Sequence, residues 1–315
     1  MTSPAFHAGE LALQQRLGVR DRMAAVGQAM IRSHMPGQHR ELFHKLPTLW
    51  LGTLDAQGRP WATVLTGMPG FMHSPDDSTL DVMASPDAQD PAAAGLTPGA
   101  PVGLLGLEPH TRRRNRMNGE LLSAGAQGFT VRVRQSFGNC PKYIQARQPQ
   151  PMPDRAPGRA HAEGPVLGAQ ALALVQASDT CFIASSSAAT PRHDGTPGAG
   201  VDLSHRGGRP GFVQVSRTPA GHQLTLPDYA GNAMFNTLGN LLLWPWAGLL
   251  FVDWTSGDLL QLSATASLVQ EGPALAAHPG AQRLLVLQVA GGLWRPAAVP
   301  LAWSAAQMAP QFQGG

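Results

Sequence analysis

Two short motifs occur twice in this chain of 315 residues, in the same order and at nearly the same spacing. Gly67-Met-Pro-Gly-Phe71 returns as Gly208-Arg-Pro-Gly-Phe212, an offset of 141 residues. Val102-Gly-Leu-Leu-Gly-Leu-Glu108 returns as Ala247-Gly-Leu-Leu-Phe-Val-Asp253, an offset of 145 residues. This period is far longer than the ~20–50 residues of solenoid repeats. The chain is therefore expected to contain a duplicated domain.

The composition favours turns and short strands over long helices. Its 36 glycines and 28 prolines make up about a fifth of the chain, and 43% of the residues are hydrophobic, which is enough to build cores. Charged residues account for 14%, and the net charge is +3. This mild positive charge permits an anionic ligand but does not by itself indicate nucleic acid.

Hydrophobic periodicity predicts helices at the N-terminus and strands in both repeated units. Apolar residues at helical spacing predict a helix over 9–35, divided near Gly18 or Gly27, and a second helix over 38–46. Alternating or continuous apolar runs predict strands. The main ones are expected at 48–54, 61–66, 80–84, 102–107, 129–134, 181–185, 222–226, 247–252, 259–266 and 283–289.

These patterns divide the chain into four parts. We expect an N-terminal helical extension over 1–46, a first strand-rich unit over 47–148, a linker over 149–164 and a second unit over 165–315. The linker is assigned because four prolines and several charges interrupt this stretch, as is typical of interdomain segments.

Several classes of protein are not expected. Cys140 and Cys181 lack the spacing of a disulfide scaffold or a zinc site, and no metal site is predicted. The N-terminus lacks the pattern of a secretory signal. The apolar run over 238–252 is too short and too interrupted to span a bilayer. We expect a soluble, cytoplasmic protein.

The stretch over 201–215 is the first candidate binding site. Ser204, His205 and Arg206 lie just before a turn whose glycines let the backbone approach a ligand closely. A permanent cation beside exposed N–H groups can hold an anion. The alternative interpretation is a connection between strands whose arginines are solvated.

Two further segments also admit both a binding and a structural interpretation. In the basic cluster 112–116, strand geometry predicts Arg112, Arg114 and Arg116 on one face. The cluster is a phosphate clamp, a patch for an acidic partner or a solvated hairpin; nucleic acid is not favoured, because no aromatic residues are interleaved. Segment 227–240 combines Asn and Gly with apolar residues, which suits either ligand donors or a capped helix.

Taken together, these motifs resemble the pyridoxamine 5′-phosphate oxidase-like, flavin-nucleotide-binding proteins. The resemblance covers about Leu46 to Ala266. The motifs are Ser204-His-Arg-Gly-Gly-Arg-Pro-Gly-Phe-Val213, Leu226-Pro-Asp-Tyr-Ala-Gly-Asn232, Leu238-Gly-Asn-Leu241 and Phe137-Gly-Asn-Cys-Pro-Lys-Tyr-Ile-Gln145. The resemblance implies a mainly β fold with peripheral helices, in which two tandem split β-barrels form an intrachain pseudo-dimer and bind FMN at their interface.

Complementary differences between the two units favour one flavin site assembled from both, although the sequence does not decide between one site and two. The second unit has His205-Arg206-Gly207 where the first has Val64-Leu65-Thr66, and only the first has the basic cluster and Asn139-Cys-Pro-Lys142. The resemblance implies ligand contacts from residues of both units. These are Ser204, His205, Arg206, Gly207, Gly211, Asn232, Thr237 and Asn240 with Arg114, Arg116, Asn139 and Lys142.

The resemblance implies an FMN-dependent oxidoreductase that acts on a small-molecule substrate by two-electron chemistry. No catalytic residue is assigned. Activity on pyridoxamine phosphate is not expected, because residues 293–315 contain Arg295 as the one arginine and no histidine. The chain lacks the four-cysteine pattern of an iron–sulfur cluster, so electrons would come from an external reductase or ferredoxin.

Two other functions remain open on the same barrel. One is a non-catalytic module that binds flavin or, less favoured, haem, and the other is an interaction domain without a ligand. Neither nucleic acid nor a membrane is expected as a partner. The chain would act as a pseudo-dimeric monomer or as a homodimer.

Overall fold

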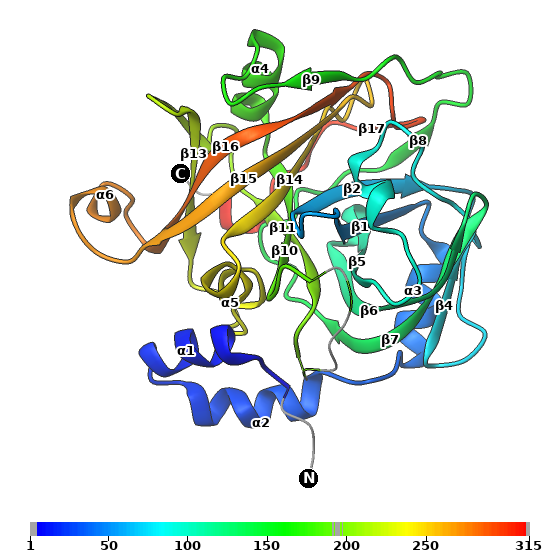
Figure 1. Cartoon of the computed structure of the whole chain (residues 1–315), viewed down its shortest axis with the longest axis horizontal. Coiled ribbons are helices and arrows are strands. Elements are labelled where there is room, and N and C mark those ends of the chain that lie inside the picture. The colour runs from blue at the N-terminus through cyan, green and yellow to red at the C-terminus, as the bar shows by residue number, and fades with distance from the viewer. Residues whose placement is uncertain (1–4, 191, 193–195, 197, 313–315) are drawn as a thin grey trace.

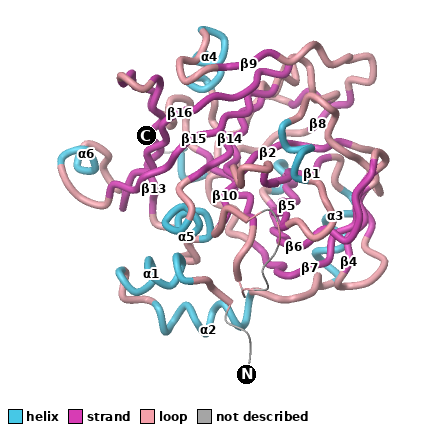
Figure 2. The backbone as a smooth tube through the Cα atoms, viewed as in Figure 1, coloured by secondary structure: helices cyan, strands magenta, loops and turns pink. Residues whose placement is uncertain are grey.

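Two antiparallel sheets form the body of the protein, and most helices lie at its periphery (Figure 1, Figure 2). The computed structural model describes residues 5–190, 192, 196 and 198–312. The first sheet has seven strands in the order β2-β1-β5-β6-β7-β4-β3. These are β1 (Thr48–Leu54), β2 (Pro60–Thr66), β3 (Met72–His73), β4 (Thr79–Val82), β5 (Pro101–Glu108), β6 (Arg113–Gly125) and β7 (Gly128–Gly138).

The second sheet has the order β11-β10-β14-β15-β16-β13-β12, with β9 (His161–Glu163) added beside β16. Its strands are β10 (Thr180–Ser186), β11 (Val201–Gly207), β12 (Gln214–Thr218), β13 (Gly221–Tyr229), β14 (Trp246–Val252), β15 (Leu259–Val269) and β16 (Ala281–Arg295). Adding nine to each label of the first sheet reproduces this order, so the two sheets have the same topology. The mainly β fold with two strand-rich units is confirmed, and the shared topology supports the duplication.

The repeated Gly-x-Pro-Gly-Phe motif forms the same turn in both units. A Cβ on Gly67 would lie 2.4 Å from Cγ of Phe71, and a Cβ on Gly208 would lie 2.4 Å from Cγ of Phe212. The second glycine of each motif has a positive φ, 96° in the first copy and 86° in the second. The motif is therefore repeated because only glycine fits at both positions: one packs under the phenylalanine ring, and the other adopts a left-handed conformation.

Each sheet encloses its own apolar core, and a third apolar cluster lies between the two sheets. In this third cluster Trp50 of β1 stacks on Phe182 of β10, with ring centroids 3.7 Å apart. The buried Gln261 of β15 donates to the carbonyl oxygen of Ala62 in β2, at 2.9 Å. The two units are therefore joined by a buried seam of the kind expected for an intrachain pseudo-dimer.

Three helices precede the first sheet: α1 (Ala8–Arg16), α2 (Arg20–Met30) and α3 (Gly37–Lys45). The helical extension is confirmed, and it divides at Gly18, which has a φ of 68°. Helix α1 packs across α5 (Asn236–Leu243) of the second unit (Figure 1). The approach is so close that a Cβ on Gly9 would lie 2.0 Å from the carbonyl oxygen of Gly239.

The segment expected to be a linker pairs with the second unit at two short strands, and the backbone N–H of Ala160 donates to Gln89 of the first unit at 2.8 Å. Strand β8 (Pro149–Pro151) pairs with β17 (Leu301–Trp303), and β9 pairs with β16. The exact domain boundaries stay a prediction.

The remaining helices are α4 (Ala169–Ala177), α6 (Pro273–Ala276) and the 3-10 turns η1 (Pro91–Gly95), η2 (Pro109–Thr111) and η3 (Pro310–Phe312). Of the helices in the described residues, none is long and apolar enough to cross a membrane.

The contact between α1 and α5 buries a carboxyl group whose titration should be visible in the stability. Glu10 is 3% exposed and accepts hydrogen bonds from the backbone N–H of His7 (2.9 Å) and from Asn236 Nδ2 (2.6 Å). Burial raises the pKa of Glu10 from 4.5 to about 8, although these two hydrogen bonds favour the ionised form. The folded state thus holds a proton that the unfolded state loses above about pH 4.5.

We expect the free energy of unfolding to fall by about 1 kcal/mol between pH 7 and pH 8 because of Glu10 alone. Glu10→Gln should remove this part of the decline, since glutamine does not titrate. Urea unfolding at the two pH values measures it, with Glu41→Gln, at an exposed glutamate on α3, as the matched control. Equal pH slopes in the wild type and Glu10→Gln would contradict the prediction.

Candidate functional site

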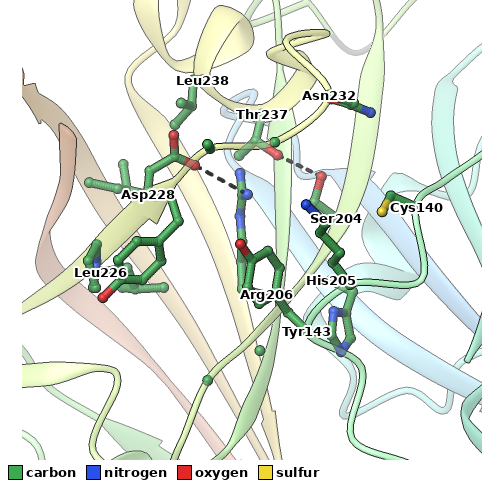
Figure 3. A pocket seen from close by; sticks show the side chains of 18 of the residues that line it. Cys140, Tyr143, Ser204, His205, Arg206, Leu226, Asp228, Asn232, Thr237 and Leu238 are labelled. Carbon is green, nitrogen blue, oxygen red and sulfur yellow. Dashed lines mark hydrogen bonds and ion pairs between the residues drawn. The ribbon is translucent and has the colours of Figure 1, made fainter. Parts of the chain in front are cut away.

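A cavity of about 730 Å³ lies at the seam and is lined by both units. The first unit contributes the start of β6 and the loop after β7. The second contributes the end of β11 with the following glycine-rich turn, the end of β13 and the first turn of α5. Figure 3 shows side chains of the cavity wall, with labelled residues from the loop after β7, from β11, from β13 and from α5. This volume is typical of pockets that bind small molecules and cofactors.

All but one of the twelve residues predicted to contact a ligand lie on the wall of this cavity. They are Ser204, His205, Arg206, Gly207, Gly211, Asn232, Thr237, Arg114, Arg116, Asn139 and Lys142. Their contact with a ligand stays a prediction. The exception is Asn240, which lies one helical turn beyond Thr237 on α5; it is buried, and its Nδ2 donates to Ser185 Oγ at 3.1 Å. Asn240 therefore holds α5 on β10 and does not face the cavity.

Only two of the three arginines that were predicted to share one face of the basic cluster reach the cavity. Arg114 and Arg116 both reach the cavity, as alternate residues of β6 should, whereas Arg113 points away and donates to the carbonyl oxygen of Gln38 at 2.7 Å. Arg112 was expected beside Arg114 and Arg116. It lies instead in the turn before β6, at a φ of 55°, and its Nε donates to the carbonyl oxygen of Ile144 at 3.1 Å. The left-handed turn interrupts the strand period, so the prediction for Arg112 was wrong.

Arg116 is held firmly at the back of the cavity. Its guanidinium lies 3.1 Å from the carboxylate of Asp202 and donates to Ser204 Oγ and to Asn236 Oδ1, both at 2.7 Å. Thr237 Oγ1 donates to the same Ser204 hydroxyl at 2.7 Å (Figure 3). This network joins the first sheet, β11 and α5. Because its polar atoms are largely paired, Arg116 is set up to position its neighbours more than to bind a new charge.

Arg114, unlike Arg116, has no carboxylate partner in the described chain. Its Nη1 lies 3.1 Å from His205 Nδ1, its Nε is buried without a hydrogen-bond partner, and no carboxylate of the described chain lies within ion-pair distance of it. Burial, and then the positive charges of Arg116 and Arg206, lower the pKa of Arg114 to about 9. The side chain still carries its charge at neutral pH. A cation left unpaired at a cavity wall favours the binding of an anion.

His205 is buried and uncharged at neutral pH. Burial lowers its pKa well below 6.5, and the charges of arginines that include Arg114 and Arg206 act in the same direction. Since a guanidinium can only donate, His205 Nδ1 is the acceptor of the hydrogen bond from Arg114. The histidine thus orients Arg114 without adding a charge.

Arg206 is 32% exposed on the cavity wall and lies 3.5 Å from the carboxylate of Asp228 (Figure 3). Arg283 shares this carboxylate, also at 3.5 Å. One negative charge therefore faces two arginines, and exposed Lys142 lies at the same cavity. The field inside the cavity is positive, which favours a negatively charged ligand.

The first turn of α5 adds backbone donors to this positive field. Phe235, its N-cap residue, has a φ of 62° and offers no side-chain hydrogen bond to the helix. Phe235, Asn236, Thr237 and Leu238 all line the cavity. An uncapped helix start leaves backbone N–H groups with partial positive charge, which suits a phosphate or carboxylate.

Five aromatic residues of the wall were not among the predicted contacts: Tyr143, Phe212, Tyr229, Phe235 and Phe312. Tyr143, at a φ of 68°, and Phe312 of η3 face each other with ring centroids 5.8 Å apart, and the carbonyl oxygen of Phe312 accepts a hydrogen bond from Arg209 at 2.7 Å. Tyr143 directly follows Lys142 and lies inside the predicted motif, so its position was available. Phe312 could not be found, because its neighbours in space are more than 100 residues away in the sequence.

Comparison with known proteins supports the resemblance. Residues 35–163 match the family model of pyridoxamine 5′-phosphate oxidase, and this match covers α3, the first unit and most of the segment expected to be a linker. A comparison with curated proteins found no match.

Several solved structures are similar to parts of the chain. HupZ of Group A Streptococcus is 15% identical, with a TM-score of 0.27, over 33% of this chain and 94% of HupZ. A candidate pyridoxamine 5′-phosphate oxidase of Lactobacillus delbrueckii is 18% identical, with a TM-score of 0.26, over 34% of this chain and 95% of the other. HutZ, the haem storage protein of Vibrio cholerae, is 14% identical, with a TM-score of 0.27, over 42% of this chain and 95% of HutZ.

The unpaired state of Arg114 predicts opposite effects on stability and on anion binding. Arg114→Met should raise the midpoint of thermal unfolding by about 2 °C in a buffer without polyvalent anions. The substitution removes a buried cation that Arg116 and Arg206 repel, and we expect this cation to destabilise the folded state by about 1 kcal/mol. The same variant should lose most of the stabilisation that inorganic phosphate gives the wild type. Arg113→Met, on the other face of β6, is the matched control and should keep that stabilisation. A variant that is less stable and responds normally to phosphate would refute this account of the site.

Proposed function

We propose that the protein binds FMN in the seam cavity and acts as a flavin-dependent oxidoreductase on a small molecule. The observation that carries this proposal is the unpaired cation Arg114 in a positive cavity between the two units of a pyridoxamine 5′-phosphate oxidase-like chain. A ribityl phosphate supplies the anion that this wall lacks.

The phosphate end of the flavin would bind where the positive charges meet. Arg114 and Arg206 provide guanidinium groups, Lys142 provides an ammonium group at the exposed side, and the start of α5 provides backbone N–H donors. The buried Nε atoms of Arg114 and Arg116 and the buried Oδ1 of Asn139 have no hydrogen-bond partner within the described chain. Unpaired polar atoms on one wall fit a polar ligand that pairs with them.

The ring end would bind against the apolar part of the wall. Phe212, Leu226, Tyr229, Phe235 and Leu238 line the cavity on the side of the second unit. A flat aromatic ring system packs favourably on such side chains and gains from their exclusion of water. The combination of an anionic group and a flat ring is the chemistry of a flavin mononucleotide.

The bound flavin would supply the two-electron chemistry, and the protein would bind, orient and shield it. Arg116 would position Ser204 and α5 through its hydrogen bonds, and His205 would orient Arg114. No side chain of the wall is assigned as a general base. Electrons would come from an external reductase, ferredoxin or reduced nucleotide.

Haem is the second candidate ligand, and a specific observation favours it. His205 is a neutral imidazole on the cavity wall, and neutral imidazole is the usual form in which histidine binds iron. The arginines would then pair with the carboxylates of the haem. The two candidates make different demands on His205, because iron requires its ring and a flavin does not.

Absorption of the purified protein separates the candidates. We expect flavin bands after reconstitution with FMN, and the ligand released on denaturation should have the mass of FMN. A Soret band that is lost in His205→Ala would favour haem instead. A protein that stays colourless and does not take up FMN would contradict both. Bleaching of the flavin bands by NADH or NADPH would separate an enzyme from a passive carrier.

Arg206→Ala should weaken FMN binding by about tenfold to a hundredfold, the usual effect of losing one hydrogen bond to a charged group. Fluorescence quenching of FMN on titration with the protein measures this affinity. Arg217→Ala is the matched control, because Arg217 is an exposed arginine on β12 of the same sheet and does not line the cavity. An unchanged affinity in Arg206→Ala would remove Arg206 from the binding site.

A further inference from the structure

The shared topology of the two sheets defines a second position related to the cavity by pseudo-twofold symmetry. The register of β6 shifts between Asn118 and Gly119, and that of β15 shifts between Ser263 and Ala264, the same place at an offset of 145 residues. This offset places Gln261 where the first site has Arg116. The second position is therefore built from β2, β15, the end of β16 and the segment between β4 and β5.

Three further correspondences follow from the repeat. Thr63 of β2 takes the place of Ser204 of β11, at the offset of 141 residues set by the Gly-x-Pro-Gly-Phe turns. The turn η1 takes the place of α5. In the sequence η1 lies between β4 and β5, and α5 lies between β13 and β14, which are the corresponding strands of the two sheets. Arg295, at the end of β16, takes the place of the residue that follows β7, which is Asn139. The second position thus has a cation of its own.

A carboxylate of the chain itself fills this second position. Asp90 Oδ1 accepts from the backbone N–H of Ala92 and from Gln261 Nε2, both at 2.9 Å. Asp90 Oδ2 accepts from Thr63 Oγ1 and from Arg295 Nη1, the latter at 2.6 Å. Both oxygens are fully used, and Asp90 is only 4% exposed. Arg295 also forms an ion pair with Asp87.

The two positions are complementary at the start of their helices. In the first, α5 has no side-chain cap, and the donors around it face a cavity. In the second, Asp90 is the N-cap of η1 and accepts from its backbone as well as from Arg295. The Asp90 carboxylate makes the set of contacts that an anionic ligand would make at such a place: a backbone N–H, a hydroxyl, an amide and a guanidinium.

We propose that Asp90 is an internal substitute for a ligand's anionic group and closes the second of two equivalent sites. The chain therefore has one anion site and binds one cofactor, and removal of the plug opens a latent oxyanion site on Arg295. The identity of the cofactor rests on the proposed function, whereas the closure of the second site rests on the contacts of Asp90 alone.

Inorganic phosphate tests the plug in a chain whose first site is disabled by Arg114→Met. In that background, Asp87→Ala/Asp90→Ala should lower the midpoint of thermal unfolding by more than 5 °C, and millimolar phosphate should restore more than half of the loss. Two control variants in the same background should show no such recovery. Asp90→Asn keeps the volume of the plug, and Asp87→Ala/Asp90→Ala/Arg295→Met lacks the cation. Destabilisation of the double alanine variant without recovery by phosphate would overturn the proposal.

Equilibrium dialysis of the wild-type chain with labelled phosphate gives an answer even if the variants do not fold. One saturable site per chain is the expected result. Two sites would overturn the closure of the second position. No site at all would contradict the proposed function and leave the closure supported, so the two proposals can fail separately.

Discussion

The stacking of Trp50 on Phe182 joins the two sheets across the seam that holds the cavity. Both rings are buried in the apolar cluster of the seam and come from the corresponding strands β1 and β10. Phe182 also contacts the edge of His205, with ring centroids 5.7 Å apart. Since His205 orients Arg114 of the other sheet, the apolar contact and the charged wall form one continuous structure. Neither sheet alone holds the site.

This seam gathers more positive charge than its own carboxylates neutralise. Asp202 pairs with Arg116 and Asp228 is shared by two arginines, but Arg114 has only the neutral ring of His205. Burial of an unpaired cation destabilises the folded chain, and the apolar cores on either side offset the cost. A site that is held ready at the expense of stability is characteristic of function rather than of packing.

The apolar periodicity and the repeated motifs were enough to predict ten of the strands and the presence of two strand-rich units, because glycine turns and alternating strands are local properties. The eleven predicted contact residues that line the cavity came from the family resemblance. Arg112 was misplaced because a left-handed turn broke the strand period, and Asn240 because one helical turn carries it past the cavity. Phe312 and Asp90 had no local signal. Their roles arise from contacts with residues far away in the sequence, which only the folded chain brings together.

The placement of both units in one chain explains why the two equivalent positions can differ. In a homodimer every seam residue appears at both symmetry-related sites, so a change made for one alters the other. In a single chain, Gln261 can replace the arginine of one position while Arg116 remains at the other. A second cluster of unpaired arginines would add repulsion to the seam. Asp90 with Arg295 instead makes the second position a paired, hydrogen-bonded contact that stabilises the fold, whereas the first position keeps the unpaired cation Arg114.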